Sequence, residues 1–238
     1  MGRRANVAYF LFCVPALLVY LLLWVVPALG NVFVSLLNWS LTIPIGSARF
    51  VGLSNYAHLI RDPLFWNALR NNAVYGLATV VVITASALLL ALLVERAIRW
   101  GRGLFRTVLF IPVILPWVVV SFLWAWLYDP ALGVIDVFLK AAGLKAVNWL
   151  GDPRIALYSL IVVGVWKSAG FFLIIFIAGL QGVPQTLEDA AYIDGASGAQ
   201  TFFRVVLPIL RPIVGVVITL GDLAFFLAAE QGIAADFG

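Results

Sequence analysis

Long apolar runs separated by short polar segments make up most of the chain, and their lengths predict membrane-spanning helices. A helix needs about 20 apolar residues to cross roughly 30 Å of hydrocarbon. The expected spans are residues 8–27 with an apolar continuation toward Leu37, 73–94, 108–127, 155–180 and the slightly shorter 213–229. We therefore predict an all-α, polytopic membrane protein with about five transmembrane helices, forming a single domain over residues 1–238.

The longest polar interruption in the second half of the chain runs from Val183 to Pro212. Pro184 suits the first turn of a helix, which Gln185 or Thr186 could cap. One face of this helix is expected to hold Leu187, Ala190 and Ala191, with Glu188, Asp189 and Tyr192 around it.

A break in this helix is expected at Asp194-Gly195, because glycine permits a backbone turn that other residues resist. Ala196 to Val206 is predicted to form a second helix, which Leu207-Pro208 closes. The small side chains at the bend would let the backbone of another protein come close. The segment is therefore predicted to be a compact helix-turn-helix between two membrane spans.

The order D-A-A-x-x-D-G-A followed by L-P resembles the EAA loop of ABC-importer permeases, and best that of the sugar-permease branch, the maltose and glycerol-3-phosphate type of the MetI-like superfamily. This resemblance implies a type I importer permease core, in which loop 181–211 is a cytoplasmic coupling loop docked on an ATPase subunit. The residues it assigns to coupling are Asp189, Ala190, Ala191, Asp194, Gly195, Ala196, Leu207 and Pro208. Asp189 replaces the glutamate of the family motif and keeps its charge. The alternative interpretation is an ordinary capped loop.

Further segments resembling the same branch are F-V-G-L-S-N-Y at residues 50–56, L-F-I-P-V-I-L-P at 109–116 and N-W-L-G-D-P at 148–153. The resemblance covers residues 8–221. Because the family continues through six spans, residues 222–238 are expected to be a divergent tail of a truncated chain, with the acid Asp222 inside the last apolar stretch. A natural short permease is the alternative.

Composition supports the membrane assignment and narrows the chemistry. Of 238 residues, 64% are hydrophobic and 11% are charged, and the mean hydropathy of +1.08 is far above that of soluble proteins. The single cysteine, Cys13, and the single histidine, His58, exclude an internal disulfide and a Cys- or His-rich metal site. Acids expected on a solvated loop are Asp129, Asp136 and Asp152. With no P-loop, G-x-S-x-G or H-E-x-x-H motif, we expect no catalytic residue, metal or cofactor, and we do not expect the chain to be an enzyme. The basic residues form no stripe, so we expect no nucleic-acid partner.

Loop charges predict which ends of the spans face the cytoplasm. The basic residues expected on one side are Arg3, Arg4, Arg96, Arg99, Arg102, Arg106, Arg204 and Arg211. Those expected on the other side are Arg49, Arg61, Arg70, Lys140, Lys145 and Arg154. The charges are denser on the first side, so the N-terminus and loop 181–211 are predicted to be cytoplasmic. Aromatic residues expected at the outer boundary are Trp39, Trp66, Trp126, Tyr128 and Trp149.

Two features of the spans are candidates for a transport path. Pro112 and Pro116 each remove a backbone hydrogen bond and bend the third span, either to line a path or as static packing. Lys167, near the middle of a span, costs on the order of 2.5–3.5 kcal/mol to insert and should face a wet cavity or a partner. The candidate substrate path is Trp166, Lys167, Phe171 and Phe172. In the alternative interpretation, Lys167 snorkels or pairs with an acid of a partner subunit.

The resemblance implies a permease subunit of an ABC importer for sugars or related polyols, in the plasma or inner membrane of a prokaryote. The implied partners are a second permease, a cytoplasmic ATPase dimer, an extracytoplasmic solute-binding protein, the sugar substrate and the lipid bilayer. ATP-driven alternating access is the implied mechanism. The alternatives are a permease for another solute class and a membrane remnant without transport activity.

Overall fold

The computed structural model describes the backbone of residues 12–40, 42, 44–98 and 100–236, with side chains described up to Gly221 except at Ala97. Predictions for Arg3, Arg4, Arg99 and the start of the first span lie outside that part of the chain. The chain divides between Leu69 and Arg70 into two compact units, each with its own internal packing.

The first unit consists of an apolar helix, a small antiparallel strand pair and a short helix. Its elements are the helical segment Phe12–Ser35, which includes the π turn η1 (Leu21–Val25) and α2 (Val26–Ser35), then β1 (Leu37–Asn38), the 3-10 turn η2 (Ile45–Ser47), β2 (Arg49–Phe50) and α3 (Ser54–Arg61). The strands place Leu37 opposite Phe50.

The F-V-G-L-S-N-Y segment closes the end of α2. Asn55 donates through Nδ2 to the backbone oxygens of Ser35 and Leu37, both at 2.9 Å. The hydroxyl of Tyr56 lies 2.6 Å from Oγ of Ser35. The last carbonyls of a helix have no donor of their own, so the amide of Asn55 supplies one. This segment therefore has a structural role beside its resemblance to a family motif.

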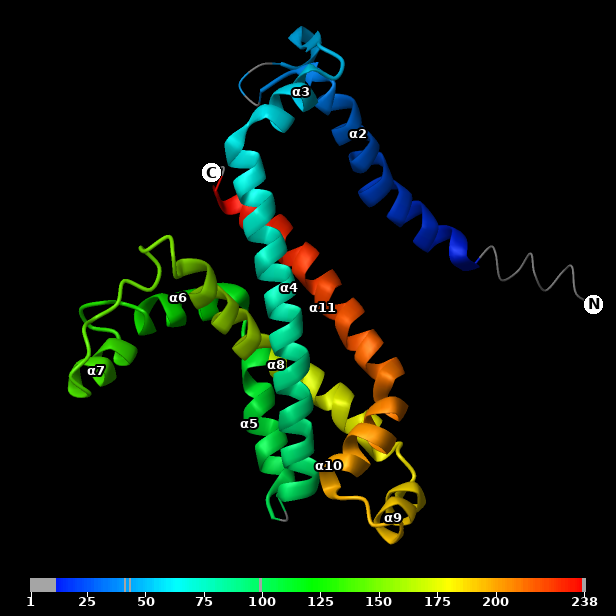
Figure 1. The fold of residues 1–238 in the computed structure, drawn as a ribbon. Helices are drawn as coiled ribbons and strands as arrows, with labels where there is room; N and C mark the ends of the chain where they lie inside the picture. Colours follow the sequence, from blue (N-terminus) through cyan, green and yellow to red (C-terminus); the bar gives the residue numbers. More distant parts are fainter. Residues whose placement is uncertain (1–11, 41, 43, 99, 237–238) are drawn as a thin grey trace, which may run out of the picture. The chain divides into compact units, whose positions relative to one another are not determined.

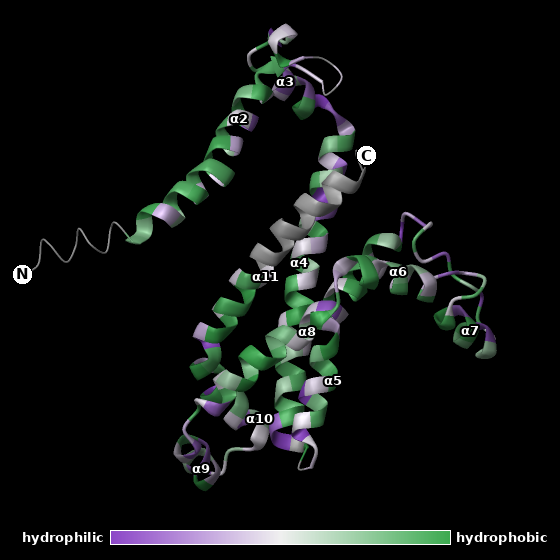
Figure 2. Cartoon of the chain, turned by 180° about the vertical axis from the view of Figure 1, so that it is seen from behind, coloured by the Kyte–Doolittle hydropathy of each residue, from purple (hydrophilic) through white to green (hydrophobic). Residues whose placement is uncertain are grey.

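The second unit contains the remaining helices, of which α4 starts at Pro63, within the first unit. They are α4 (Pro63–Leu92), η3 (Leu93–Ala97), α5 (Arg102–Ile114), α6 (Trp117–Leu127), α7 (Val134–Ala141), α8 (Ala156–Gln181), α9 (Gln185–Ile193), α10 (Gly198–Thr201), η4 (Phe202–Val206) and α11 (Leu207–Asp236) (Figure 1). Within the described residues, four helices are long and apolar enough to cross a membrane, and the bent pair α5–α6 makes a fifth crossing if it is one span. Apolar residues line α4 and α8, whereas polar residues gather near α9 and between α6 and α7 (Figure 2). The predicted all-α fold with about five spans is confirmed.

Helix α8 is the centre of the second unit. The main cluster of buried side chains joins α8 to α4, η4 and α11, and its largest fully buried members are Phe176, Leu173 and Leu210. On the side facing α5, a Cβ atom added to Gly170 would overlap the backbone carbonyl of Leu109. Such small residues let membrane helices approach closely and gain packing energy.

The third expected span, residues 108–127, is not one continuous helix. Helix α5 ends at Ile114, α6 begins at Trp117, and the two helices are bent by 99°. Leu115 is extended, with ψ 135°, because a following proline disfavours the helical conformation. The bend predicted at Pro116 is confirmed, and it divides the span into two helices. Pro112 lies inside α5.

The second helix of loop 181–211 does not end at Leu207-Pro208, as predicted, but continues from α10 through η4 into α11. At the end of η4, the N–H of Leu207 donates to the carbonyl of Phe202, one residue further back than in an α-helix. Pro208 has no N–H, and in a regular helix its ring would press against the carbonyl four residues earlier. The wider π turn directly before Pro208 provides room for the ring, so the helix continues.

Candidate functional site

Loop 181–211 contains a short helix whose beginning differs from the prediction. Helix α9 starts at Gln185, its N-cap residue is Pro184, and no side chain caps it. Gln185 and Thr186, the expected caps, therefore lie inside the helix. The next helix is capped instead: Ser197 and Gln200 exchange hydrogen bonds with each other's backbone N–H in a capping box.

The turn after α9 has the geometry that the sequence predicts. Gly195 has φ +80°, and its N–H donates to the carbonyl of Tyr192 at 3.0 Å. The N–H of Ala196 donates to the carbonyl of Ala191 at 2.9 Å. These two bonds form a Schellman motif, whose left-handed residue is usually glycine. The predicted break at Asp194-Gly195 is confirmed.

Helix α9 directs apolar side chains outward and a charged one inward. Leu187 is 46% exposed, Ile193 is 85% exposed, and Ala190 is also exposed. The buried side carries Glu188, which is only 7% exposed. Hydropathy patterns place charged residues at the surface, so nothing in the sequence singled out Glu188.

Two ion pairs lie at the end of α4, and one of them contains the buried Glu188. Nη2 of Arg96 in η3 donates to Oε1 of Glu188 at 2.8 Å. The neighbouring Glu95 accepts a hydrogen bond from Arg106 of α5. Consecutive residues of one π turn thus connect α9 and α5 to the end of α4. In the sequence, the two arginines indicate only a basic loop that is expected to be cytoplasmic.

The remaining coupling residues are distributed over two places. Asp189 is exposed and its Oδ1 accepts from Nε2 of Gln185 at 3.2 Å, and Asp194 is the C-cap of α9. Leu207 and Pro208 instead lie half-buried in the first turn of α11. The structure therefore gathers residues 189–196 in one short segment, with the other two at the start of the next long helix.

Lys167 is buried in α8 at 8% exposure and is bonded to the break between α5 and α6. Its Nζ donates to the carbonyl of Val113 at 2.7 Å. In a continuous helix that carbonyl would accept from the N–H of Trp117, but the bend at Pro116 separates the two. The ammonium also lies 5.5 Å from the centre of the Trp117 ring, within the range of a cation–π interaction. Lys167 thus caps the C-terminal end of α5, where a positive charge is favourable.

The other residues of the candidate substrate path differ in their exposure. Trp166 and Phe171 are exposed at 36% and 44%, whereas Phe172 is buried at 3%. The ring of Trp166 instead ends a row of aromatic contacts that continues through Trp124, Tyr128 and Trp149, with centroid distances of 5.1–5.5 Å. The substrate path stays a prediction.

The segment before α8 is held by a buried acid that was expected to be solvated. Asp136 of α7 is fully buried and accepts hydrogen bonds from the N–H of Val147 at 2.9 Å and from Nε1 of Trp149 at 3.0 Å. Tyr128, expected at the outer boundary, is also buried, and its hydroxyl donates to the carbonyl of Ser159. The solvated interpretation was therefore wrong for Asp136, whose partners fold back onto it.

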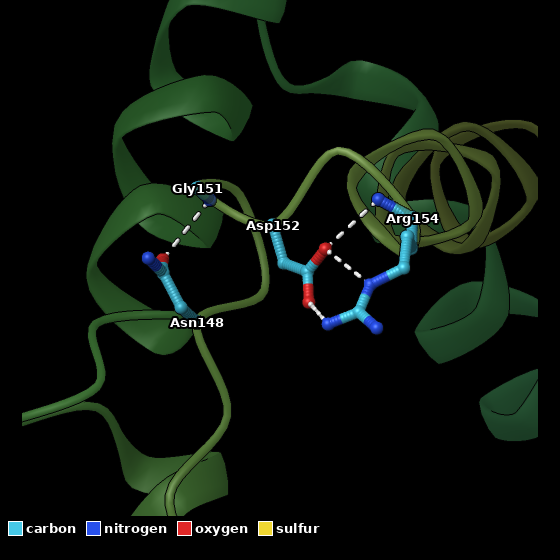
Figure 3. A network of polar contacts seen from close by, with 4 residues as sticks. All are labelled: Asn148, Gly151, Asp152 and Arg154. Carbon is cyan, nitrogen blue, oxygen red and sulfur yellow. Dashed lines mark hydrogen bonds and ion pairs between the residues drawn. The ribbon is translucent and has the colours of Figure 1, made fainter.

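The N-W-L-G-D-P segment forms the turn into α8 (Figure 3). Oδ1 of Asn148 accepts from the N–H of Gly151 at 3.0 Å. Asp152 accepts from the backbone N–H, Nε and Nη2 of Arg154 at 2.9–3.1 Å. Hydrogen bonds from the Arg154 side chain and backbone lower the pKa of the Asp152 carboxyl below its usual value. The charged acid therefore favours this turn at neutral pH.

Comparison with known proteins gives a consistent result. The family model described as "binding-protein-dependent transport system inner membrane component" matches residues 87–229. This match extends beyond Gly221, where the resemblance noted in the sequence ends. A probable ABC transporter permease protein of Bacillus subtilis, YurN, is 38% identical over 225 residues, covering 92% of this chain and 76% of that protein. The trehalose/maltose transport system permease protein MalF of Thermococcus litoralis is 33% identical over 218 residues, covering 92% and 72%. The fold is similar to that of a bacterial ABC transporter involved in the import of the acidic polysaccharide alginate, with a TM-score of 0.78, 22% identity and coverage of 92% and 73%.

Proposed function

Because the chain belongs to the family of inner membrane components of binding-protein-dependent transport systems, we propose that it is a permease subunit of an ABC importer for sugars or related polyols. Loop 181–211 is the part that couples it to a cytoplasmic ATPase. The chain itself performs no covalent chemistry in this proposal. It supplies membrane helices that rearrange when the ATPase closes on ATP.

The observation that carries the proposal is the outward apolar face of α9. Leu187 and Ile193 are exposed beside polar residues such as Gln185 and Asp189, and the small residues Ala190 and Gly195 are exposed as well. An exposed apolar patch rimmed by polar residues is typical of a protein-interaction site. The order of residues in this segment matches the EAA motif, in which such a face meets the ATPase.

Relatives favour a carbohydrate over other solutes. The Thermococcus litoralis relative is a trehalose/maltose permease, and a related fold occurs in an alginate importer solved with an alginate-bound periplasmic protein. The proposed partners are accordingly a second permease, an ATPase dimer and an external solute-binding protein. A permease for another solute class is the second candidate, and a membrane remnant without transport activity is the third.

Reconstitution of the complete transporter tests the proposal. We expect proteoliposomes containing this chain, its partner permease, its ATPase and its binding protein to accumulate labelled maltose or trehalose only when ATP is present. Liposomes without this chain are the control. ATP-dependent uptake of amino acids but not of sugars would favour the second candidate, and no uptake of any solute would favour the third.

Membrane orientation is tested by cysteine labelling from one side. In a chain whose Cys13 is replaced by serine, we expect a membrane-impermeant maleimide added outside to react with Ala146→Cys but not with Ala199→Cys. Both positions are exposed, and Ala199 takes no part in the capping box of Ser197. Permeabilised cells, in which both variants should react, provide the control. The reverse pattern in intact cells would place loop 181–211 outside.

A further inference from the structure

The π turn η3, which follows α4, contacts the buried cluster, α5 and α9. Its residue Val94 is 2% exposed and belongs to the main buried cluster, so the turn is fixed to the core of the second unit. The next two residues point to different helices: Glu95 pairs with Arg106 of α5, and Arg96 pairs with Glu188 of α9. One turn therefore joins the core, α5 and α9.

In the ion pair that joins η3 to α9, the carboxylate of Glu188 is the buried partner. The side chain of Glu188 is 9% exposed and that of Arg96 is 35% exposed. A buried carboxylate needs a close cation, because an unpaired buried charge is strongly unfavourable. Glu188 is therefore held at Arg96 as long as α9 keeps its present position.

Within its own loop, α9 packs mainly against α10 and η4. Those elements lead on to α11, and they reach α4 only through the apolar contacts of the main buried cluster. The pair Arg96–Glu188 makes that connection directly, between residues 92 positions apart in the chain. It also lies on the inward side of α9, whereas Leu187 and Ile193 are exposed on other sides.

We propose that Arg96 and Glu188 are positioning residues that transmit displacement of α9 to α4, and through Glu95 and Arg106 to α5. This proposal rests on the proposed function, because it assumes that an ATPase moves α9. A partner that pulls or pushes the outer face of α9 then moves the ends of two membrane helices together. Without the pair, the ATPase still binds the outer face, but less of its movement reaches α4 and α5.

The test compares Arg96→Gln, Glu188→Gln and the double variant in the reconstituted transporter. We expect each single variant to retain the ATPase in copurification and to lower the number of sugar molecules imported per ATP hydrolysed by about tenfold, the size of effect typical of close charge pairs. The double variant should be no worse than either single one, because residues acting through one contact are not additive. Arg154→Gln removes an 88% exposed partner of another ion pair and should leave the ratio unchanged.

Each other outcome overturns the inference in a recognisable way. Loss of ATPase copurification in the single variants would mean that the pair shapes the docking face. An unchanged import-to-hydrolysis ratio, or additive losses in the double variant, would mean that movement does not pass through the pair. Failure of the wild-type chain to retain the ATPase would instead contradict the proposed function itself.

Discussion

Replacing Gly195 by valine is expected to reduce the ATPase that copurifies with the permease by about tenfold, because the turn strain of roughly 1–2 kcal/mol falls on the docking segment. Gly195 has φ +80°, a conformation that β-branched residues rarely adopt. Among the described residues, apart from the two chain neighbours, no atom lies within 4 Å of the position that a Cβ would occupy. The expected loss therefore comes from the backbone, which would have to abandon the bonds that Gly195 and Ala196 make to α9.

Gly195→Asn is the matched control, because asparagine tolerates the left-handed conformation better than other residues with a side chain. We expect it to retain most of the ATPase, although it is larger than glycine. Membrane insertion of both variants should equal that of the wild type, since the turn lies outside the long apolar helices. Equal copurification by the valine and asparagine variants would show that the backbone of this turn is not required for docking.

Replacing Gly170 by alanine is expected to destabilise the chain by about 1–3 kcal/mol, the usual effect of overpacking a close contact. The added methyl group would meet the carbonyl of Leu109 and the Cα of Phe110, which are backbone atoms and cannot rotate away. Helix α8 would have to move from α5, and the bond from Lys167 to Val113 would lengthen with it. Thermal unfolding in detergent, followed by loss of helical signal or by aggregation, measures the effect.

Gly215→Ala provides a control for the general effect of alanine in a helix. Gly215 lies in α11, and no described atom outside the backbone of its own helix and its chain neighbours lies within 4 Å of its potential Cβ. We expect this variant to be as stable as the wild type or slightly more stable, because alanine loses less conformational freedom than glycine on forming a helix. Similar melting temperatures for the Gly170 and Gly215 variants would refute the close packing of α5 and α8.

The membrane helices could be predicted because bilayer thickness imposes a long, uninterrupted signal on the sequence. Helix α8 covers 156–181, close to the expected 155–180. The turn at Gly195 was equally predictable, since the conformation required there selects one residue type. In both cases the signal lies within the segment that it describes.

Features that depend on distant partners could not be predicted in this way. The prolines indicate a bend in residues 108–127, but the carbonyl freed by that bend is satisfied by Lys167, 54 residues later. Burial of Asp136 depends on Trp149, and burial of Glu188 depends on Arg96. An isolated charge in the sequence looks the same whether its partner is water or a residue of another helix, so a solvated role is the natural expectation.

The bond between Lys167 and Val113 also bears on how the chain enters the membrane. Alone in lipid, α8 would carry an unpaired ammonium, at a cost of about 2.5–3.5 kcal/mol. The carbonyl that receives this ammonium lies in α5, which the ribosome completes before α8. We expect α5 to be retained beside the translocon until α8 emerges, so that the two helices pass into lipid as a preformed pair.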